Sequence, residues 1–359
     1  MRVIQMLPNL AYGDAIGNDT LTLGDTLHAN GYETKTYANY IDKRIQSPLV
    51  APIEDYVCRP DDVIIYHLST GNDMNYTFSE YECQKIIMYH NVTPPKFFEG
   101  YDQFMADVCE SGLRATKYLK KHADYCFADS EFNRQELIEM GYTCDIEVLP
   151  ILIAFDDYKK TPNAKVLKKY EKDDYVNIVF TGRVAPNKKH EDLIAAFAYY
   201  KKNINPKSRL ILVGNHLMTP GYYPRLSNYI EKLGVEDVVF TGHIRFDEIL
   251  AYYKIADVFL CLSEHEGFCV PLVEAMYFDV PIVAYDSCAI GETLGGSGLL
   301  LPEKDPAVAA EAINLIMEDR ELREKLIIGQ RKRLEDFQHD KIKEQFLNAI
   351  RRFTEGEKL

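Results

Sequence analysis

The sequence predicts an α/β protein with two doubly wound parallel sheets in tandem. Short apolar runs alternate with segments of helical periodicity, which is the pattern of parallel sheets with crossover helices. This alternation starts twice, near residue 2 and again near residue 176. The chain has 359 residues, more than a single compact core usually holds, so two domains are expected.

The first half is expected to hold six strands and three helices. Ser130 is a suitable N-cap for a helix, and Gly31 and Gly141 stand where glycines end helices. The strands are expected near 2–7, 33–37, 62–66, 85–89, 125–129 and 146–149, and the helices near 18–30, 101–121 and 131–140.

The second half is expected to repeat this plan after a polar segment. Residues 156–174 are rich in charge, which is typical of an interdomain linker or a long surface loop. Strands are expected near 176–181, 209–213, 238–241, 257–262 and 281–285. Helices are expected near 190–202, 224–233, 246–254, 272–278, 305–318, 321–337 and 340–353.

These elements predict a domain organisation. We expect an N-terminal Rossmann-like domain over 1–158, a C-terminal one over 159–338, and a last helix in 339–359 that packs back on the N-terminal domain. Ligands of such sheets bind at the carboxyl ends of the strands. With two domains facing each other, the shared cleft is the expected active site.

Composition and missing motifs exclude several functions. The net charge of −14 argues against nucleic acid as a partner. The sequence has no D-x-D, P-loop or H-E-x-x-H motif, so we expect no metal and no cofactor. Its eight cysteines form no C-x-x-C pair, which favours reduced thiols in the cytoplasm. The first ten residues resemble a buried strand, not a cleaved leader, and no apolar run is long enough to span a membrane.

A cationic loop follows the strand expected at 176–181. Gly182 allows a tight exit from the strand, and Arg183 and Lys188 then lie at its carboxyl end. An arginine fork and a lysine point charge together suit a diphosphate. Two solvated surface charges are the alternative interpretation.

Two glutamates flank the start of a helix in the segment EGFCVPLVE. Glu266 lies in the loop before the helix, and Glu274 lies near its first turn. The amides of Gly267, Phe268, Cys269 and Val270 should lie at the helix N-terminus, where sugar hydroxyls or phosphate oxygens bind well. Carboxylates bind vicinal hydroxyls because they accept two hydrogen bonds. The alternative is that Glu274 only complements the helix dipole.

The first half offers two histidines and a glycine-containing loop. His67 and His90 each follow an expected strand, and two such histidines favour a polar cleft wall over a purely structural role. The loop after the first strand contains Gly13 and Asp14 and could approach a ligand closely. Because it lacks G-x-G-x-x-G, it does not favour a dinucleotide.

Taken together, these motifs resemble the large retaining GT-B glycosyltransferase family GT4, glycosyl transferases group 1. Glu266 and Glu274 match its E-x7-E pair, and Gly182, Arg183 and Lys188 match its G-R-x-x-x-x-K loop. The chain also resembles a bacterial subgroup of the family that is associated with cell-surface polysaccharide assembly. The segments that carry this resemblance are YGDAIGND, YHLSTG, YHNVTPP and ADSEFN. The chain departs from the family at Cys269, where glycine is common, and at the Gly13-Asp14 pair, where the family often has two glycines.

The resemblance implies a role for each of these residues. Arg183 and Lys188 would stabilise the departing nucleoside diphosphate, and Glu274 would hold the ribose. Glu266 and the Gly267–Val270 amides would orient the sugar, and His90 would contact the donor sugar or line the acceptor site. Backbone near His243 and Ile244 would contact the base. Retention would come from front-face attack, because no enzyme nucleophile is evident.

The implied reaction moves a hexose from a nucleotide-diphosphate sugar to a hydroxyl of a growing, lipid-linked or surface glycan. GDP-mannose is favoured as donor, with UDP- and dTDP-sugars as alternatives. A non-catalytic sugar-nucleotide-binding subunit and a nucleotide-sugar 2-epimerase remain as other interpretations. A basic stripe on the helix with Arg114, Lys117, Lys120 and Lys121 is either a solvated face or a peripheral contact with the inner face of the cell membrane.

Overall fold

A computed structural model describes residues 1–170, 173–217 and 219–355 of the chain. Two compact units, each with its own sheet, make up the protein. The first unit comprises Met1–Pro95, Met105–Ala154 and the segment from Phe337 onward, and the second comprises Lys96–Phe104 and Phe155–Asp336. Residues 171–172 of the predicted linker and 356–359 of the predicted last helix lie outside the described residues.

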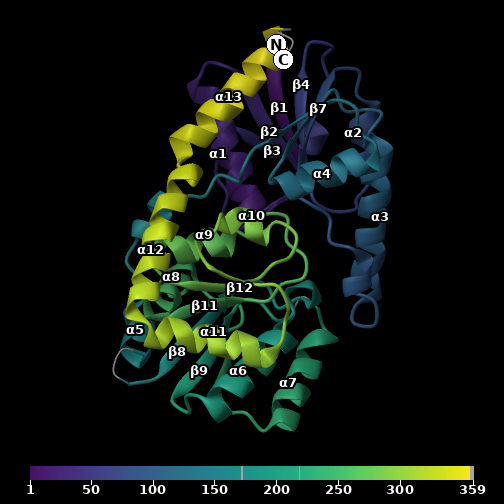
Figure 1. Ribbon diagram of the computed structural model, residues 1–359. Coiled ribbons are helices and arrows are strands. Elements are labelled where there is room, and N and C mark those ends of the chain that lie inside the picture. Colours follow the sequence, from purple (N-terminus) through teal and green to yellow (C-terminus); the bar gives the residue numbers. More distant parts are fainter. Residues whose placement is uncertain (171–172, 218, 356–359) are drawn as a thin grey trace. The chain divides into compact units, whose positions relative to one another are not determined.

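The sheet of the first unit has seven parallel strands in the order β3-β2-β1-β4-β5-β6-β7 (Figure 1). The strand order reverses beside β1, so the sheet is doubly wound. Its strands are β1 Arg2–Leu10, β2 Glu33–Ile41, β3 Val50–Pro52, β4 Val63–Leu68, β5 Gln84–Tyr89, β6 Tyr125–Ala128 and β7 Asp145–Val148. The helices of this unit are α1 Ala15–Ala29, α2 Met74–Glu80, α3 Gln103–Leu119, α4 Glu131–Met140 and α13 His339–Glu355.

Alternate residues of the central strands enter different cores. Val63 and Ile65 of β4 join one apolar cluster, whereas Ile64 of the same strand joins another. Successive strand side chains point to opposite faces of a sheet, so both faces of this sheet are covered. The predicted caps of α4 are confirmed: Ser130 accepts a hydrogen bond from the Asn133 amide, and Gly141 has a left-handed φ of 91°.

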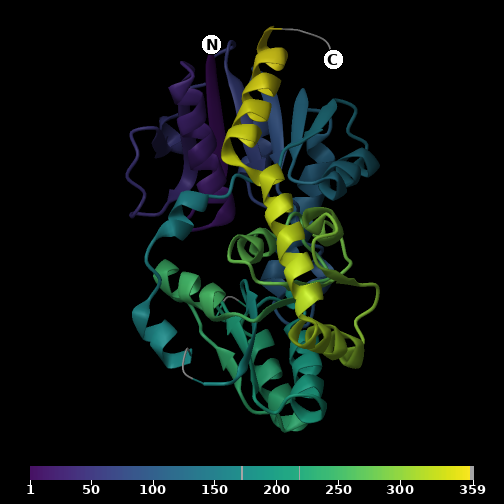
Figure 2. The ribbon, with the colours of Figure 1, turned by 60° about the vertical axis from the view of Figure 1, so that its left-hand side comes forward.

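Helix α13 returns the end of the chain to the first unit. Ile342, Phe346 and Ile350 repeat at four-residue intervals, which gives the helix one apolar stripe. All three are buried in a cluster with Val3 and Leu23. Figure 2 shows α13, in yellow, lying across the strands of the first sheet. Through this apolar stripe, helix α13 packs into the core of the first unit.

The sheet of the second unit has six parallel strands in the order β10-β9-β8-β11-β12-β13 (Figure 1). The strands are β8 Val176–Thr181, β9 Ser208–Val213, β10 Val238–Phe240, β11 Val258–Cys261, β12 Ile282–Tyr285 and β13 Leu299–Leu301. The helices are α5 Ala164–Tyr170, α6 His190–Asn203, α7 Tyr222–Leu233, α8 Phe246–Ile255, α9 Val270–Tyr277, α10 Ile290–Leu294, α11 Pro306–Glu318 and α12 Arg320–Leu334.

Several elements differ from the sequence predictions. The expected linker contains a helix, α5, because Val166 and Tyr170 are buried against Val179 and Ile211 of the sheet. Helix α1 begins at Ala15 and not near residue 18, since Asp14 already caps it. The short elements β3, α2, α10 and β13 were not predicted.

A segment from the first half of the sequence belongs to the second unit. The Phe97 ring lies 6.0 Å from the His265 ring, and the Tyr101 ring lies 5.2 Å from the Tyr222 ring, edge-on. Arg225 lies over the Tyr101 ring at 5.3 Å, a cation–π contact. These aromatic contacts attach residues 96–104 to the second unit, an arrangement that hydrophobic periodicity does not reveal.

Two further sequence expectations can be compared with the structure. In the described ranges, none of the helices has both the length and the apolar character needed to cross a bilayer. All eight cysteines are free thiols.

Candidate donor site

The cationic loop begins where β8 ends. Gly182 donates its amide to the Val213 carbonyl at 2.9 Å, and Val184 donates to the Asn215 carbonyl at 2.9 Å. A Cβ atom on Gly214 would lie only 1.9 Å from the Gly182 carbonyl oxygen, so the two loops after β8 and β9 can approach only with glycine there. Sequence reasoning did not single out Gly214. The glycine directly after the apolar run of β9 was the available signal.

Both cations of this loop lie at the carboxyl edge of the second sheet. Arg183 is exposed, and among the residues that the structure describes no carboxylate forms an ion pair with it. Lys188 ends a short 3₁₀ turn, Pro186–Lys188, just before α6. A positively charged side chain at the end of a strand is well placed to bind an anion.

Lys188 is paired with the first glutamate of the second motif. Its Nζ atom lies 2.7 Å from Glu266 Oε1, and both side chains are largely buried. Burial lowers the pKa of Lys188, but the neighbouring Glu266 carboxylate outweighs it and holds that pKa above its ordinary value. Lys188 is therefore charged, and the structure brings together two motifs 78 residues apart.

Backbone and side-chain hydrogen bonds hold the Glu266 loop in place. The Glu264 amide donates to the Asn187 carbonyl at 2.8 Å, and Asn187 Nδ2 donates to the His265 carbonyl at 3.0 Å. Thr293 Oγ1 donates to the Phe268 carbonyl at 2.6 Å. The loop after β11 is thus fixed from both sides before any ligand binds.

Glu274 has partners that the sequence did not indicate. Tyr158 Oη donates to Glu274 Oε1 at 2.9 Å, and Tyr253 Oη donates to Oε2 at 2.6 Å. Burial raises the pKa of Glu274 above its ordinary value, against the opposing effect of these two hydrogen bonds. The two tyrosines orient the carboxylate and leave its remaining lone pairs for further donors.

The helix that carries Glu274 starts at a strained residue. Cys269 precedes α9 with φ 70° and ψ 65°, the left-handed region that glycine adopts without strain. This conformation explains why a glycine would suit this position. Phe268 and Cys269 are buried, Gly267 and Val270 are half-buried, and Pro271 occupies the first turn of the helix.

The residues predicted near the base follow β10. His243 is exposed, whereas Ile244 packs against the core of the second unit. Gly214 and Gly242 form an isolated bridge, which joins the loops after β9 and β10. The structure therefore places these two residues at the same sheet edge as Gly182 and Gly214.

The predicted residues of the first unit lie at the carboxyl edge of their own sheet. Asp14 caps α1, where its Oδ2 accepts a 3.4 Å hydrogen bond from the Gly17 amide, and Gly13 has a left-handed φ of 76°. Asp14 also raises the pKa of His90, although it is not the largest influence. The two predicted sites of this unit are thus neighbours.

His67 and His90 are hydrogen-bonded on adjacent strands. His90 directly follows β5 as expected, whereas His67 lies within β4 and not after it. His67 Nδ1 lies 2.9 Å from His90 Nε2, and His90 Nδ1 lies 2.9 Å from Asp129 Oδ2. The His90 side chain is only 1% exposed, so both of its ring nitrogens are used within the unit. Asp129, which follows β6, was not identified from the sequence as part of this group.

Comparison with known proteins finds a family similarity in the second unit. Residues 161–333, just under half of the chain, match the family model described as glycosyl transferases group 1. The chain is 27% identical over 184 residues to the Campylobacter jejuni GalNAc-alpha-(1->4)-GalNAc-alpha-(1->3)-diNAcBac-PP-undecaprenol alpha-1,4-N-acetyl-D-galactosaminyltransferase, covering 50% of this chain and 49% of that protein. It is 25% identical over 197 residues to O-antigen chain mannosyltransferase B of Escherichia coli, covering 53% and 51%. The chain spans about half the length of these relatives.

Solved structures share the fold over nearly the whole chain. Sucrose-phosphate synthase from Thermosynechococcus elongatus superposes with a TM-score of 0.77 at 19% identity, covering 99% of this chain and 100% of that one. Anabaena HepE in complex with UDP and glucose superposes with a TM-score of 0.76 at 19% identity, covering 98% and 99%. The predicted GT-B fold, with two Rossmann-like parallel α/β domains, is confirmed, and residues 161–333 are similar to the glycosyl transferases group 1 family.

Proposed function

We propose that the protein is a retaining hexosyltransferase that moves a hexose from a nucleotide-diphosphate sugar to a hydroxyl of a growing surface glycan. The observation that carries this proposal is the buried Lys188–Glu266 pair, which joins the two donor motifs at one sheet edge. The group 1 match covers both motifs. GDP-mannose is the favoured donor, because mannosyltransferases are among the relatives, including one from Mycobacterium tuberculosis named as GDP-mannose-dependent. A UDP-sugar is the main alternative, since HepE was solved with UDP-glucose.

In this proposal the donor is held by charge and by paired oxygens. Arg183 and Lys188 stabilise the negative charge that develops on the leaving diphosphate. Glu274, oriented by Tyr158 and Tyr253, accepts hydrogen bonds from the ribose hydroxyls. Glu266 and the backbone at the start of α9 orient the sugar, and the loop with His243 and Ile244 contacts the base. The site needs no metal, because the two cations carry out charge stabilisation.

The name of one relative supports the acceptor that we propose. The Campylobacter relative is named for an undecaprenol-diphosphate-linked acceptor. We propose a comparable lipid-linked or polymeric glycan acceptor for this chain, reached from the cytoplasmic side of the membrane. Asp14 and Gly13, at the edge of the first sheet, are the proposed acceptor-side contacts.

A thermal-shift panel of nucleotide sugars tests the donor site. A donor present at about 100 times its Kd should add about 2.7 kcal/mol to the unfolding free energy. GDP-mannose, UDP-glucose and a dTDP-sugar are compared with the matching nucleoside monophosphates, which lack the diphosphate. The proposal fails if no member of the panel raises the melting temperature, or if Lys188→Ala responds as the wild type does.

A further inference from the structure

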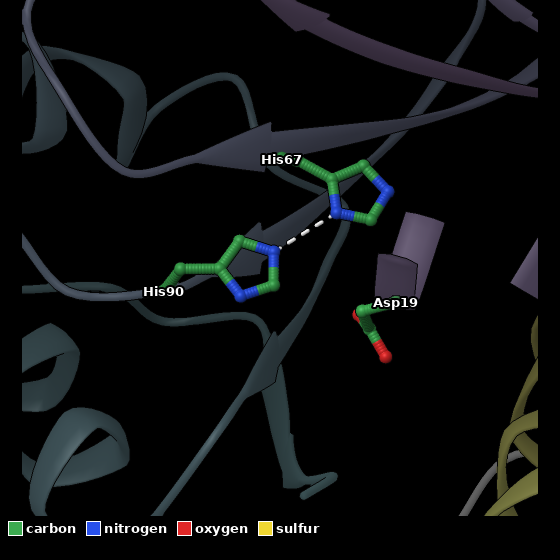
Figure 3. A group of neighbouring side chains, drawn as sticks. All are labelled: Asp19, His67 and His90. Atoms are coloured by element: carbon green, nitrogen blue, oxygen red, sulfur yellow. Dashed lines mark hydrogen bonds between the residues drawn. The ribbon is translucent and has the colours of Figure 1, made fainter. Parts of the chain in front are cut away.

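A row of buried side chains crosses the first unit below the carboxyl edge of its sheet. Asp129 Oδ2 lies 2.9 Å from His90 Nδ1, and His90 Nε2 lies 2.9 Å from His67 Nδ1. His67 Nε2 then lies 3.0 Å from Gln5 Oε1. All four side chains are buried, and Asp19 lies beside the two rings (Figure 3). The row therefore connects four neighbouring strands of the sheet, β1, β4, β5 and β6, through buried side chains.

The partners at the two ends of the row fix how many protons it holds. Gln5 Nε2 donates to the Thr20 carbonyl at 2.8 Å, so Gln5 presents its oxygen to His67 and Nε2 of His67 must donate. The carboxylate of Asp129 likewise accepts from Nδ1 of His90. Both outer nitrogens thus carry protons. Thr20 Oγ1 also lies 3.3 Å from Nδ1 of His67, but its hydroxyl donates to the Ile16 carbonyl, so the two inner nitrogens, 2.9 Å apart, need one more proton between them. Two rings then carry three N–H protons, so one of them is an imidazolium.

The geometry between the rings suits a proton better than a metal ion. Atoms of Asp19, His67 and His90 lie within 4.8 Å of one another, which by itself would allow a metal. However, the rings are nearly coplanar, at 5°, and their centroids are 5.2 Å apart. The centroid separation equals the 2.9 Å N–N distance plus about two ring radii, so the two centroids and the two nitrogens lie nearly on one line. The ring nitrogens therefore point at each other and not at a shared third point, where a metal ion would lie. This is the arrangement of a linear N–H···N hydrogen bond.

The surrounding charges place the extra proton on His90. Asp129, directly after β6, contacts it, and the charges of Asp19 in α1 and of Asp14 at the N-cap of α1 also favour its protonated form. Burial lowers the pKa of His90, but these carboxylates prevail and hold it above the ordinary value. Burial and the nearby His90 charge both lower the pKa of His67. His67 is therefore the neutral acceptor and His90 the cation.

We propose that Asp129, His67 and Gln5 are positioning residues that keep His90 as a charged imidazolium at neutral pH, at the carboxyl edge of the first sheet. The catalytic part of the inference rests on the proposed function together with the family resemblance, by which His90 would contact the donor sugar or line the acceptor site. Both N–H groups of His90 are used inside the unit, so the ring acts through its positive charge and transfers no proton. A fixed charge in a water-free environment stabilises negative charge that develops in a transition state.

Nitrogen-15 NMR of histidine-labelled protein tests the protonation state without any need for activity. We expect both nitrogens of His90 to be protonated at neutral pH, whereas His67 carries a proton only at Nε2. Asp129→Asn should lower the pKa of His90 by about one unit or more, as loss of an adjacent opposite charge does. His67→Gln should preserve the charged state, because its amide oxygen still accepts, and His67→Leu should not. A neutral His90 in the wild type throughout about pH 6 to 8, the range in which an ordinary histidine titrates, overturns the inference.

The pH dependence of kcat tests whether the reaction uses this charge. A cationic His90 is lost as pH rises through its raised pKa, so the wild type should lose activity on the alkaline side, and Asp129→Asn should lose it at lower pH. His67→Gln should keep the wild-type alkaline limb, and His28→Gln, at an exposed position, serves as the control. An unmoved alkaline limb in Asp129→Asn contradicts the catalytic part of the inference. If the wild type turns over no nucleotide sugar, the proposed function fails, and the NMR result still decides whether the imidazolium exists.

Discussion

The ammonium group of Lys188 lies 2.7 Å from the Glu266 carboxylate, and this pair links the loop after β8 to the loop after β11. The carboxylate compensates a buried cation that a diphosphate could also neutralise. Binding of a diphosphate at Lys188 would therefore free Glu266 to accept hydrogen bonds from a sugar. In the proposed function, the ion pair would thus let one site bind both the diphosphate and the sugar of the donor.

Loss of either cation should slow transfer. Arg183→Ala and Lys188→Ala should each raise the activation barrier by roughly 2–4 kcal/mol, because each removes one group that stabilises developing charge. Steady-state kcat with a saturating donor measures this, with exposed Lys254→Ala as the control. Near-wild-type kcat in both variants would contradict the proposed role of Arg183 and Lys188 in stabilising the leaving diphosphate. Since Lys188→Ala also leaves Glu266 buried and unpaired, the Lys188→Ala, Glu266→Gln double variant should be more stable in urea than Lys188→Ala alone.

Glu274 should recognise the ribose. A carboxylate held by Tyr158 and Tyr253 can still accept a hydrogen bond from a ribose hydroxyl. Wild-type protein should therefore bind GDP more tightly than 2′-deoxy-GDP in calorimetry, by about 1.5–3 kcal/mol for a charged hydrogen bond. Glu274→Gln should lose most of this discrimination. Equal discrimination in the variant and the wild type would place the ribose elsewhere. If UDP proves to be the bound nucleotide, the same comparison is made with UDP and 2′-deoxy-UDP.

The left-handed backbone at Cys269 predicts an unusual mutational response. A β-branched side chain is poorly tolerated at φ 70°, so Cys269→Val should lower the unfolding free energy by about 1–2 kcal/mol. Cys269→Gly should lose less, because glycine adopts this conformation without strain. Urea unfolding measures both, and Cys126→Val, in the extended strand β6, is the matched control. A Cys269→Val variant as stable as Cys126→Val would show that the backbone there is not constrained.

Asp19 should give the first unit a distinctive pH dependence. Burial is the main cause that raises its pKa to about 7, whereas an unfolded aspartate titrates near 3.9. Between about pH 4 and 7 the folded state therefore binds more protons than the unfolded state, and stability falls as pH rises. Asp19→Asn should show a shallower fall in urea unfolding measured at several pH values, and exposed Asp73→Asn should match the wild type. An unchanged slope in Asp19→Asn would contradict this account.

The fold was largely predictable from the sequence, because both sheets consist of apolar runs separated by amphipathic helices. The elements that the sequence did not predict are short or rich in charge. Strands β3 and β13 have three residues each, too few to show a period. Helix α5 is rich in lysine and buries only Val166 and Tyr170, so its charge suggested a loop.

The candidate site was predictable where a motif carries it and not where distant residues complete it. The positions of Arg183 and Glu266 in loops were predictable because each residue comes shortly after an apolar strand, and the end of such a strand is a local feature of the sequence. The pairing of Glu274 with Tyr158 spans 116 residues, and that of His90 with Asp129 spans 39. Such contacts depend on sheet order and on which turn of a helix faces the edge, and no local pattern in the sequence specifies either.

The release of nucleoside diphosphate from a nucleotide sugar, with the product followed by proton NMR, is the most direct test of the proposed function. The proposal predicts that the purified protein consumes one nucleotide sugar in the presence of a glycan acceptor and without added metal. The transferred hexose should keep the anomeric configuration of the donor, and Lys188→Ala should abolish most of the release. Conversion of the donor without an acceptor would instead indicate an epimerase. Binding without any consumption would leave only a sugar-nucleotide-binding subunit and would contradict the proposal.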